Sequence, residues 1–192
     1  MSTSQIIQRN FLEHVQSTEA TKDALSGIIS VVSKILAHSL SNGGTVFWCG
    51  NGGSASDSQH MAAELVGRFK KNRRPLRSIA LNADTAVLTC VANDFSYHSI
   101  FSRQLEAHGR SGDILIGIST SGQSENVLNA FKAARSIGIT TVALLGKGGG
   151  SATDLVDHAL IVPSDTTARI QESHILIGHI LCELIEVELG IS

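Results

Sequence analysis

The sequence has little proline, few aromatic residues and a low content of charge. Of its 192 residues only two are proline, 4% are aromatic and 17% are charged, whereas 42% are hydrophobic. Disordered and collagen-like chains have other compositions, so we expect a folded chain with a buried core. The length lies within the usual range of one domain, and we expect a single domain over residues 1–192.

The charges nearly cancel, with a formal net charge of −2 at pH 7. A protein that binds nucleic acid through its charge carries a strongly basic face, so direct nucleic-acid binding is not expected. The first residues lack the basic and apolar regions of a signal peptide, and no apolar run approaches the length that spans a bilayer. We therefore expect a cytoplasmic protein that has no membrane partner.

Cysteine is scarce as well. Cys49, Cys90 and Cys182 are odd in number, far apart and without CxxC spacing. This pattern argues against a disulfide framework and against a zinc site built from cysteines. We expect all three to be small, buried, apolar side chains.

Apolar residues at helical spacing predict two helices in the N-terminal segment 1–42, the second ending at Asn42-Gly43-Gly44. Five short apolar runs then alternate with helical stretches, at residues 45–49, 78–81, 114–118, 140–145 and 159–162. This alternation predicts an α/β core over residues 43–192, in three αβα layers around a five-stranded parallel sheet of the doubly wound, flavodoxin-like kind. A last helix is expected from about Thr167 to Leu189.

Two turns of this core have unusual composition, and ligands of such sheets bind beyond the carboxyl ends of the strands. The segment Ser119-Thr120-Ser121-Gly122-Gln123-Ser124 follows the third strand and offers hydroxyls at a helix start, which favours a phosphate group. A serine that merely caps the helix is the alternative. Gly50-Asn51-Gly52-Gly53-Ser54 permits close approach of the backbone to a ligand, although a tight strand-to-helix connection explains its glycines equally well.

Three titratable side chains stand out on the predicted helices. His60 and Glu64 are four residues apart and share one helix face, where they can bind a metal or act together on a substrate. A simple ion pair on a solvent-facing surface is the alternative. His179 interrupts an apolar helix, and it is either a functional group or an ordinary core histidine whose hydrogen bonds are satisfied.

Four segments together resemble the phosphoheptose isomerases over essentially the whole chain: Cys49–Ser54, Asn93-Asp94-Phe95, Gly117–Gly122 and Arg169-Ile170-Gln171-Glu172. The resemblance implies the sugar isomerase (SIS) fold and a homotetramer whose active sites lie at subunit interfaces. It also implies conversion of sedoheptulose 7-phosphate to D-glycero-D-manno-heptose 7-phosphate through an enediol. That reaction is the first step of ADP-heptose and lipopolysaccharide core biosynthesis. No nicotinamide or flavin is implied.

The resemblance also implies a set of site residues. Glu64 and His179 match the acid–base pair of the family, and one Zn²⁺ per subunit would be bound by His60, Glu64, Gln171 and His179. Substrate contacts are matched by Asn51, Gly52, Gly53, Glu64, Asn93, Asp94, Ser119, Thr120, Ser121, Ser124 and Gln171, with Ser54 and Arg68 as adjacent candidates. A regular helix separates Gln171 and His179 by about 12 Å along its axis and by about 80° around it, which makes a shared ion difficult.

One alternative has the same fold and no isomerase activity, namely the proteins that bind the replication initiator DnaA. They share the segments around Gln59-His60-Met61 and Arg169–Glu172, and the segment Asn82-Ala83-Asp84 also favours this alternative. They lack the pair that corresponds to Glu64 and His179, so the presence of both favours the isomerase. A third class, a regulatory domain that senses sugar phosphates, would need the phosphate loop and no acid–base pair.

Overall fold

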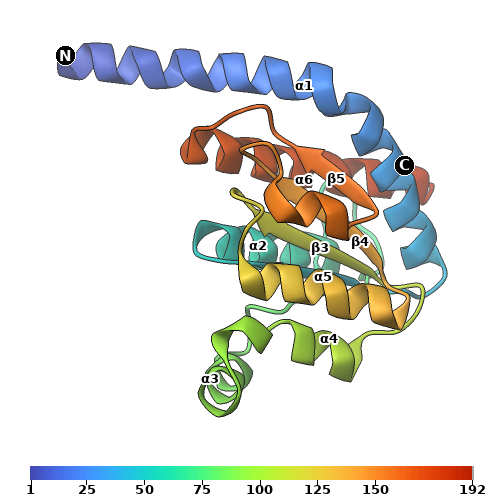
Figure 1. The fold of residues 1–192 in the computed structure, drawn as a ribbon. Coiled ribbons are helices and arrows are strands. Elements are labelled where there is room, and N and C mark those ends of the chain that lie inside the picture. Colours follow the sequence, from blue (N-terminus) through green and yellow to red (C-terminus); the bar gives the residue numbers. More distant parts are fainter. Residues whose placement is uncertain (192) are drawn as a thin grey trace.

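The computed structural model describes residues 1–191, and its centre is a five-stranded, all-parallel sheet between helices (Figure 1). The strands are β1 (Val46–Gly50), β2 (Ser78–Ala80), β3 (Ile114–Ser119), β4 (Thr140–Leu145) and β5 (His158–Ile161). Their spatial order is β2-β1-β3-β4-β5, which is the doubly wound, flavodoxin-like order. The predicted fold class is therefore confirmed.

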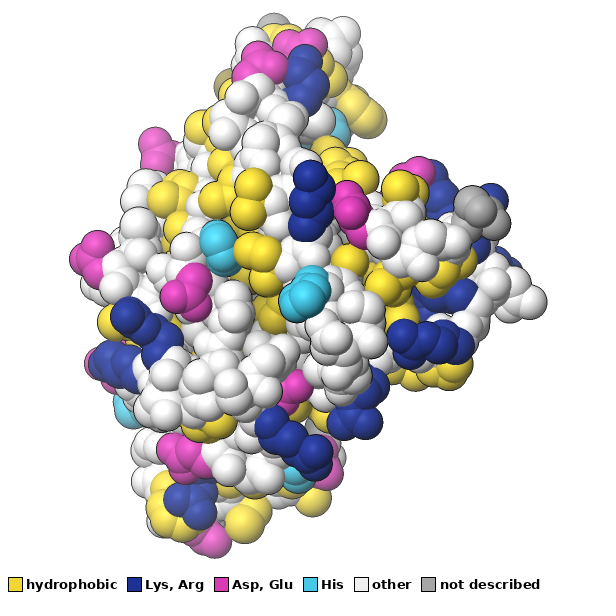
Figure 2. All heavy atoms as spheres, turned by 90° about the vertical axis from the view of Figure 1, so that its right-hand side faces the viewer, with side chains coloured by type: hydrophobic (Ala, Val, Ile, Leu, Met, Phe, Trp, Pro, Cys, Tyr) yellow, Lys and Arg dark blue, Asp and Glu magenta, His cyan; other side chains and the backbone are white. Residues whose placement is uncertain are grey.

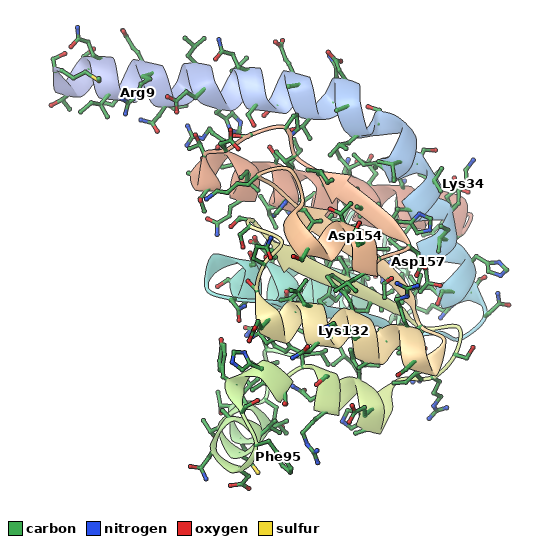
Figure 3. All side chains as sticks on the ribbon, in the orientation of Figure 1. Arg9, Lys34, Phe95, Lys132, Asp154 and Asp157 are labelled. Atoms are coloured by element: carbon green, nitrogen blue, oxygen red, sulfur yellow. The ribbon has the colours of Figure 1, made fainter. Side chains whose placement is uncertain are left out.

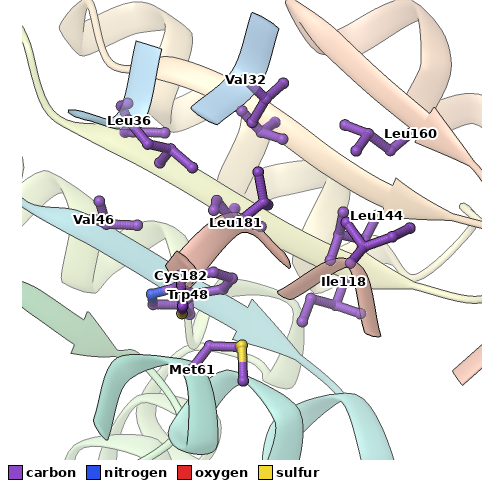
Figure 4. Packing of buried hydrophobic residues seen from close by; sticks show 14 of the residues in the cluster. Val32, Leu36, Val46, Trp48, Met61, Ile118, Leu144, Leu160, Leu181 and Cys182 are labelled. Atoms are coloured by element: carbon purple, nitrogen blue, oxygen red, sulfur yellow. The ribbon is translucent and has the colours of Figure 1, made fainter. Parts of the chain in front are cut away.

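Helices cover both faces of this sheet. They are α1 (Thr3–Ser41), α2 (Gly53–Val66), α3 (Thr85–Asp94), α4 (Ser102–His108), α5 (Glu125–Ile137) and α6 (Thr167–Glu188), with the short 3-10 helices η1 (Tyr97–Ser99) and η2 (Gly150–Leu155). Successive residues of β1 alternate between two cores, because side chains of a strand point to opposite faces. Val46 and Trp48 pack with α1, α2 and α6, whereas Phe47 and Cys49 pack with α3, α4 and α5. Figure 4 shows the first core around Trp48, Met61 and Leu181.

The N-terminal segment forms one helix of 39 residues, so the prediction of two helices was wrong. Polar residues between the two apolar stretches produced the error. Ser17 and Thr21 are nevertheless buried, and the Thr21 hydroxyl donates to the Ser17 carbonyl (2.7 Å) within the helix. A polar residue whose hydrogen bond is satisfied inside the helix does not interrupt it.

The first half of α1, called the free half below, extends beyond the body of the protein and meets α6 through Asn10 and His14, whereas the second half packs its apolar side chains on α6 (Figure 1). Figure 3 shows Arg9 on the free half and Lys34 on the packed half. By length and composition α1 would be able to cross a membrane, so the expectation that no segment has this length was wrong. A core helix of a soluble protein has the same property, and 39% of the apolar window of α1 is buried in the fold.

The cysteines are free, but only two of the three are buried. Cys49 and Cys182 lie in the two cores, and burial raises the pKa of the Cys182 thiol to about 12. The prediction for Cys90 was wrong, because it lies on the exposed side of α3, with its sulfur 3.5 Å from Asp94 Oδ2. Apolar character in the sequence does not reveal which face of a short helix is covered.

The surface carries both signs of charge. On the face in Figure 2 acidic and basic side chains are interspersed, and Lys and Arg gather toward its right-hand edge. The segment that follows α2 contributes exposed cations at Arg68, Lys70, Lys71, Arg74 and Arg77. Helix α2 ends at Val66, and residues 67–77 form an irregular connection to β2.

His174 of α6 is a titratable group buried in the core. It is 1% exposed, and its Nε2–H donates to the Leu145 carbonyl (2.9 Å). Burial lowers the pKa of His174 to about 4, although the hydrogen bond to Leu145 acts in the opposite direction. The folded protein therefore holds this imidazole neutral where an unfolded chain would protonate it.

We predict a pH-dependent loss of stability from His174. Its pKa is near 6.5 unfolded and about 4 folded, so the unfolded state binds more protons between these values and the free energy of unfolding falls as pH drops through this window. The effect is on the order of 2–3 kcal/mol. Urea unfolding at pH 4.5–7 should show a flatter dependence for His174→Gln, whereas exposed His108→Gln should match the parent. Equal slopes in all three proteins would contradict the prediction.

Candidate active site

The two unusual turns lie side by side at one edge of the sheet. β1 and β3 pair in parallel, with Gly50 opposite Ile118. The glycine turn (residues 50–54) and the serine loop (residues 119–124) therefore leave adjacent strands at the same end. This is the edge at which open α/β sheets bind ligands.

The serine loop is held by its own hydroxyls. Ser119 is buried, and its Oγ accepts from the Gly122 N–H (3.1 Å) and lies 3.3 Å from Ser124 Oγ. Ser121 Oγ accepts from the Gln123 N–H (3.2 Å). Gly122 has φ of +62°, and a Cβ there would overlap the carbonyl of Gly149 in the neighbouring loop, so only glycine fits.

These contacts argue against a simple helix cap. Ser124 is the N-cap residue of α5, yet its side chain makes no capping hydrogen bond. Within residues 1–191, the first-turn N–H groups of Glu125 and Asn126 have no hydrogen-bond partner. Free N–H groups at a helix start, next to several hydroxyls, form an environment that suits a phosphate.

A pair of amides joins the two turns. Asn51 Nδ2 donates to Asn126 Oδ1 and Asn126 Nδ2 donates to Asn51 Oδ1, each at 2.9 Å. Tyr97 of η1 adds a hydrogen bond from its hydroxyl to Asn51 Oδ1 (2.9 Å). Asn126 is 2% exposed and Asn51 is half-buried, so this reciprocal pair links the two turns at the border of the core. Sequence reasoning missed Asn126 and Tyr97; an asparagine directly after a serine-rich loop was the available signal.

A second cluster lies where α2 and α6 run side by side. His60 and Glu64 share one face of α2, as predicted, with His60 Nε2 3.1 Å from Glu64 Oε1. His179 of α6 places its ring against His60, with ring centroids 5.1 Å apart. One ligand atom from each of the three residues lies within 4.8 Å of the others. Two imidazoles and a carboxylate are a donor set that zinc uses in proteins.

Two further residues border this cluster. Phe69 stacks on His179, with ring centroids 5.5 Å apart and an angle of 18° between the planes. Asp57 lies one turn before His60, and burial raises the pKa of its carboxyl, whereas the nearby His60 and His179 act to lower it. Neither residue was singled out from the sequence, because nothing in its local pattern distinguishes it.

Gln171 lies at the other end of the same pair of helices. A Cβ on Gly53 would approach Gln171 Nε2 to 2.9 Å, and a Cβ on Gly178 would overlap the Met61 side chain. The two helices therefore run in the same direction, with Gln171 beside the glycine turn and His179 beside His60 and Glu64. The role of Gln171 as a metal ligand stays a prediction.

The remaining predicted residues are more dispersed. Asn93 and Asp94 end α3 on the exposed surface, where Asn93 Nδ2 donates to Asp94 Oδ1 (2.8 Å). Neither forms a hydrogen bond with another predicted site residue in the described part of the chain. Thr120 is half-buried in the serine loop, Ser54 is buried in the first turn of α2, and Arg68 is exposed beyond its end.

Comparison with known proteins gives the family. The SIS domain model matches residues 10–146. A phosphoheptose isomerase from Nitratiruptor sp. is 52% identical over 94% of this chain and 96% of its own length, and one from Helicobacter pylori is 50% identical over 94% of each chain. The chain belongs to the phosphoheptose isomerase family. The solved structure of a phosphoheptose isomerase from Francisella tularensis has a TM-score of 0.95 and 39% identity, covering 97% of this chain and all of its own.

For this member of the phosphoheptose isomerase family, we predict that Ser119→Ala combined with Ser121→Ala weakens the binding of phosphate compounds about 100-fold or more. Each hydroxyl lost from a charge-assisted hydrogen bond is worth about 1.5–3 kcal/mol. Protection against thermal unfolding by inorganic phosphate measures the effect, with Ser136→Ala at the far end of α5 as control. If phosphate protects the double variant as well as the parent, the loop serves only to shape the start of the helix.

Proposed function

We propose that this chain is an aldose–ketose isomerase that converts sedoheptulose 7-phosphate into D-glycero-D-manno-heptose 7-phosphate. The observation that carries the proposal is the meeting of Glu64 and His179, a carboxylate and an imidazole from two helices. The family membership supplies the substrate class, and the serine loop offers a place for its phosphate. The reaction would be the first step in the biosynthesis of ADP-heptose and the lipopolysaccharide core, and it would take place in the cytoplasm.

The reaction moves one proton between carbons and another between oxygens. Glu64 removes the proton from C1 of the ketose while His179 delivers a proton to the oxygen on C2, which gives a cis-enediol. His179 then takes the proton from the C1 hydroxyl, and Glu64 returns its proton to C2. Substrate and product have the same atomic composition, and no external oxidant or reductant is required.

The phosphate-binding end contributes without taking part in the proton transfers. Ser119, Thr120, Ser121 and Ser124 would hold the C7 phosphate together with the free N–H groups of α5. Asn51, Gly52, Gly53 and Gln171, and from the exposed end of α3 Asn93 and Asp94, would contact the sugar. Binding energy from this remote group aligns the reacting carbons with Glu64 and His179.

The cluster also fits a zinc ion. His60, Glu64 and His179 present three donor atoms within 4.8 Å of one another, and imidazole nitrogens and a carboxylate oxygen are donor types that zinc takes from protein. We propose that they bind one Zn²⁺ per subunit, with Gln171 as the fourth ligand that the family resemblance implies. A bound zinc would polarise the substrate carbonyl as a Lewis acid.

We also propose a homotetramer with active sites at subunit interfaces. The free half of α1 exposes apolar side chains at Ile6, Ile7, Phe11, Leu12 and Val15. Exposed apolar surface of this extent is typical of an interaction site. Arg169 and Glu172 of α6 contact α1 at Asn10 and His14, and they flank Gln171 in the sequence. A second copy of the chain that covers α1 would therefore also lie beside Gln171.

The DnaA-binding alternative is the second candidate. The relatives at 50–52% identity carry the name phosphoheptose isomerase. The meeting of Glu64 with His179 also supports an enzyme, because a protein that only binds a partner has no need of an acid–base pair.

Replacing Glu64 with glutamine tests the base. Glu64→Gln keeps the side-chain volume and removes the proton acceptor, so turnover of sedoheptulose 7-phosphate should fall by roughly 10²-fold or more. Substrate binding should largely persist. Glu106→Gln, an exposed glutamate on α4, is the matched control and should retain full turnover. A correctly assembled Glu64→Gln protein with activity within a few-fold of the parent would contradict the assignment of Glu64 as the base.

Replacing His179 with asparagine tests the acid–base and metal roles together. The parent should turn over sedoheptulose 7-phosphate and contain zinc by elemental analysis. His179→Asn should lose both and keep its oligomeric state, since a carboxamide binds zinc far less well than imidazole. A parent that shows no turnover with added Zn²⁺, and that binds DnaA tightly, would instead support the regulatory alternative.

A further inference from the structure

A buried ion pair joins the two helices that carry the candidate acid–base residues. Glu64 lies in the last turn of α2, and His179 lies in the second half of α6. Arg73 and Glu186 form an ion pair at 2.9 Å, with side chains only 2% and 3% exposed. The pair is too deeply buried to be an ordinary surface salt bridge, and the reaction itself does not use it.

Glu186 holds the segment that follows α2. It lies seven residues after His179, about two turns further along the same face of α6. Its carboxylate accepts N–H groups from Phe69 (3.2 Å), Lys70 (3.1 Å) and Lys71 (3.1 Å), besides the Arg73 Nε–H. Burial alone would raise the pKa of Glu186, but these hydrogen bonds lower it, so the group is charged at neutral pH.

Arg73 holds the end of α2 directly. Its Nη2 donates to the carbonyl of Glu64 (2.9 Å), and its Nη1 donates to the carbonyl of Leu65 (2.8 Å). Last-turn carbonyls of a helix have no partner within the helix, and a buried cation is a strong donor for them. The backbone of the candidate base is therefore tied through Arg73 to a carboxylate on α6.

The same segment reaches His179 through Phe69. Glu186 fixes the Phe69 backbone, and the Phe69 ring stacks on the His179 imidazole. Glu186 thus acts on both members of the pair: through Arg73 on Glu64, and through Phe69 on His179.

We propose that Glu186 and Arg73 are positioning residues that fix the placement of Glu64 relative to His179. This inference rests on the proposed isomerase function. Neither residue touches the substrate, so their removal should lower turnover and the affinity for Zn²⁺ while leaving substrate binding nearly unchanged. Residues that orient the ligands of a metal typically change its affinity by about 10- to 100-fold.

The test compares Glu186→Gln with Glu183→Gln. Both glutamates lie on α6, but Glu183 is exposed and pairs with the Lys70 side chain (2.7 Å) at the surface. For Glu186→Gln we expect kcat to fall at least about tenfold, KM to stay within about twofold, and Zn²⁺ affinity, measured by competition with a chromophoric chelator, to fall at least about tenfold. Glu183→Gln should match the parent in all three quantities.

A second variant covers the case in which Glu186→Gln does not fold. Phe69→Leu keeps the ion pair and an apolar side chain, and it removes the ring from His179, so it should also lower kcat and Zn²⁺ affinity. The inference is overturned if a folded Glu186→Gln equals Glu183→Gln, or if Glu186→Gln is unfolded and Phe69→Leu equals the parent. A parent without turnover of sedoheptulose 7-phosphate would instead refute the proposed function, and the Zn²⁺ measurements would still decide the positioning role.

Discussion

The in-register parallel pairing of β1 with β3 is the constraint on which the candidate site depends. Because Gly50 lies opposite Ile118, the glycine turn and the serine loop leave the sheet at adjacent points, and the Asn51–Asn126 amides can meet. A slip of one residue would exchange the faces to which Trp48 and Phe47 point. The two cores that fix this register therefore also fix the distance between the loops.

Much of the fold was predictable because buried parallel strands are short, nearly continuous apolar runs. All five strands and their sheet were found in this way. The errors arose where polarity and burial disagree: Ser17 and Thr21 are polar but buried in α1, and Cys90 is apolar in character but exposed. The short helix α4 was missed because Leu105 and Gln104 are its only buried residues, too few to form a periodic pattern.

The candidate site was predictable only in part. Composition pointed to the serine loop, and spacing placed His60 and Glu64 on one face. The approach of His179 depends on how α2 lies against α6, which no local pattern contains, and the family resemblance supplied it. Asn126, Arg73 and Glu186 were missed for the same reason, since the contacts that define their roles are long-range: Asn126 with Asn51 is 75 residues apart in the chain, and Arg73 with Glu186 is 113 residues apart.

The buried Arg73–Glu186 ion pair between the end of α2 and α6 has two possible effects, one on the stability of the fold and one on the relative position of the two helices. A buried ion pair is often no more stabilising than a well-packed apolar pair of similar volume. An apolar pair would hold the helices together here, but it would leave the carbonyl of Glu64 and the N–H groups of residues 69–71 without partners. Those groups need a cation and an anion at fixed positions. The ion pair is therefore better explained by the fixed geometry that an acid–base pair on two helices requires than by a gain in stability.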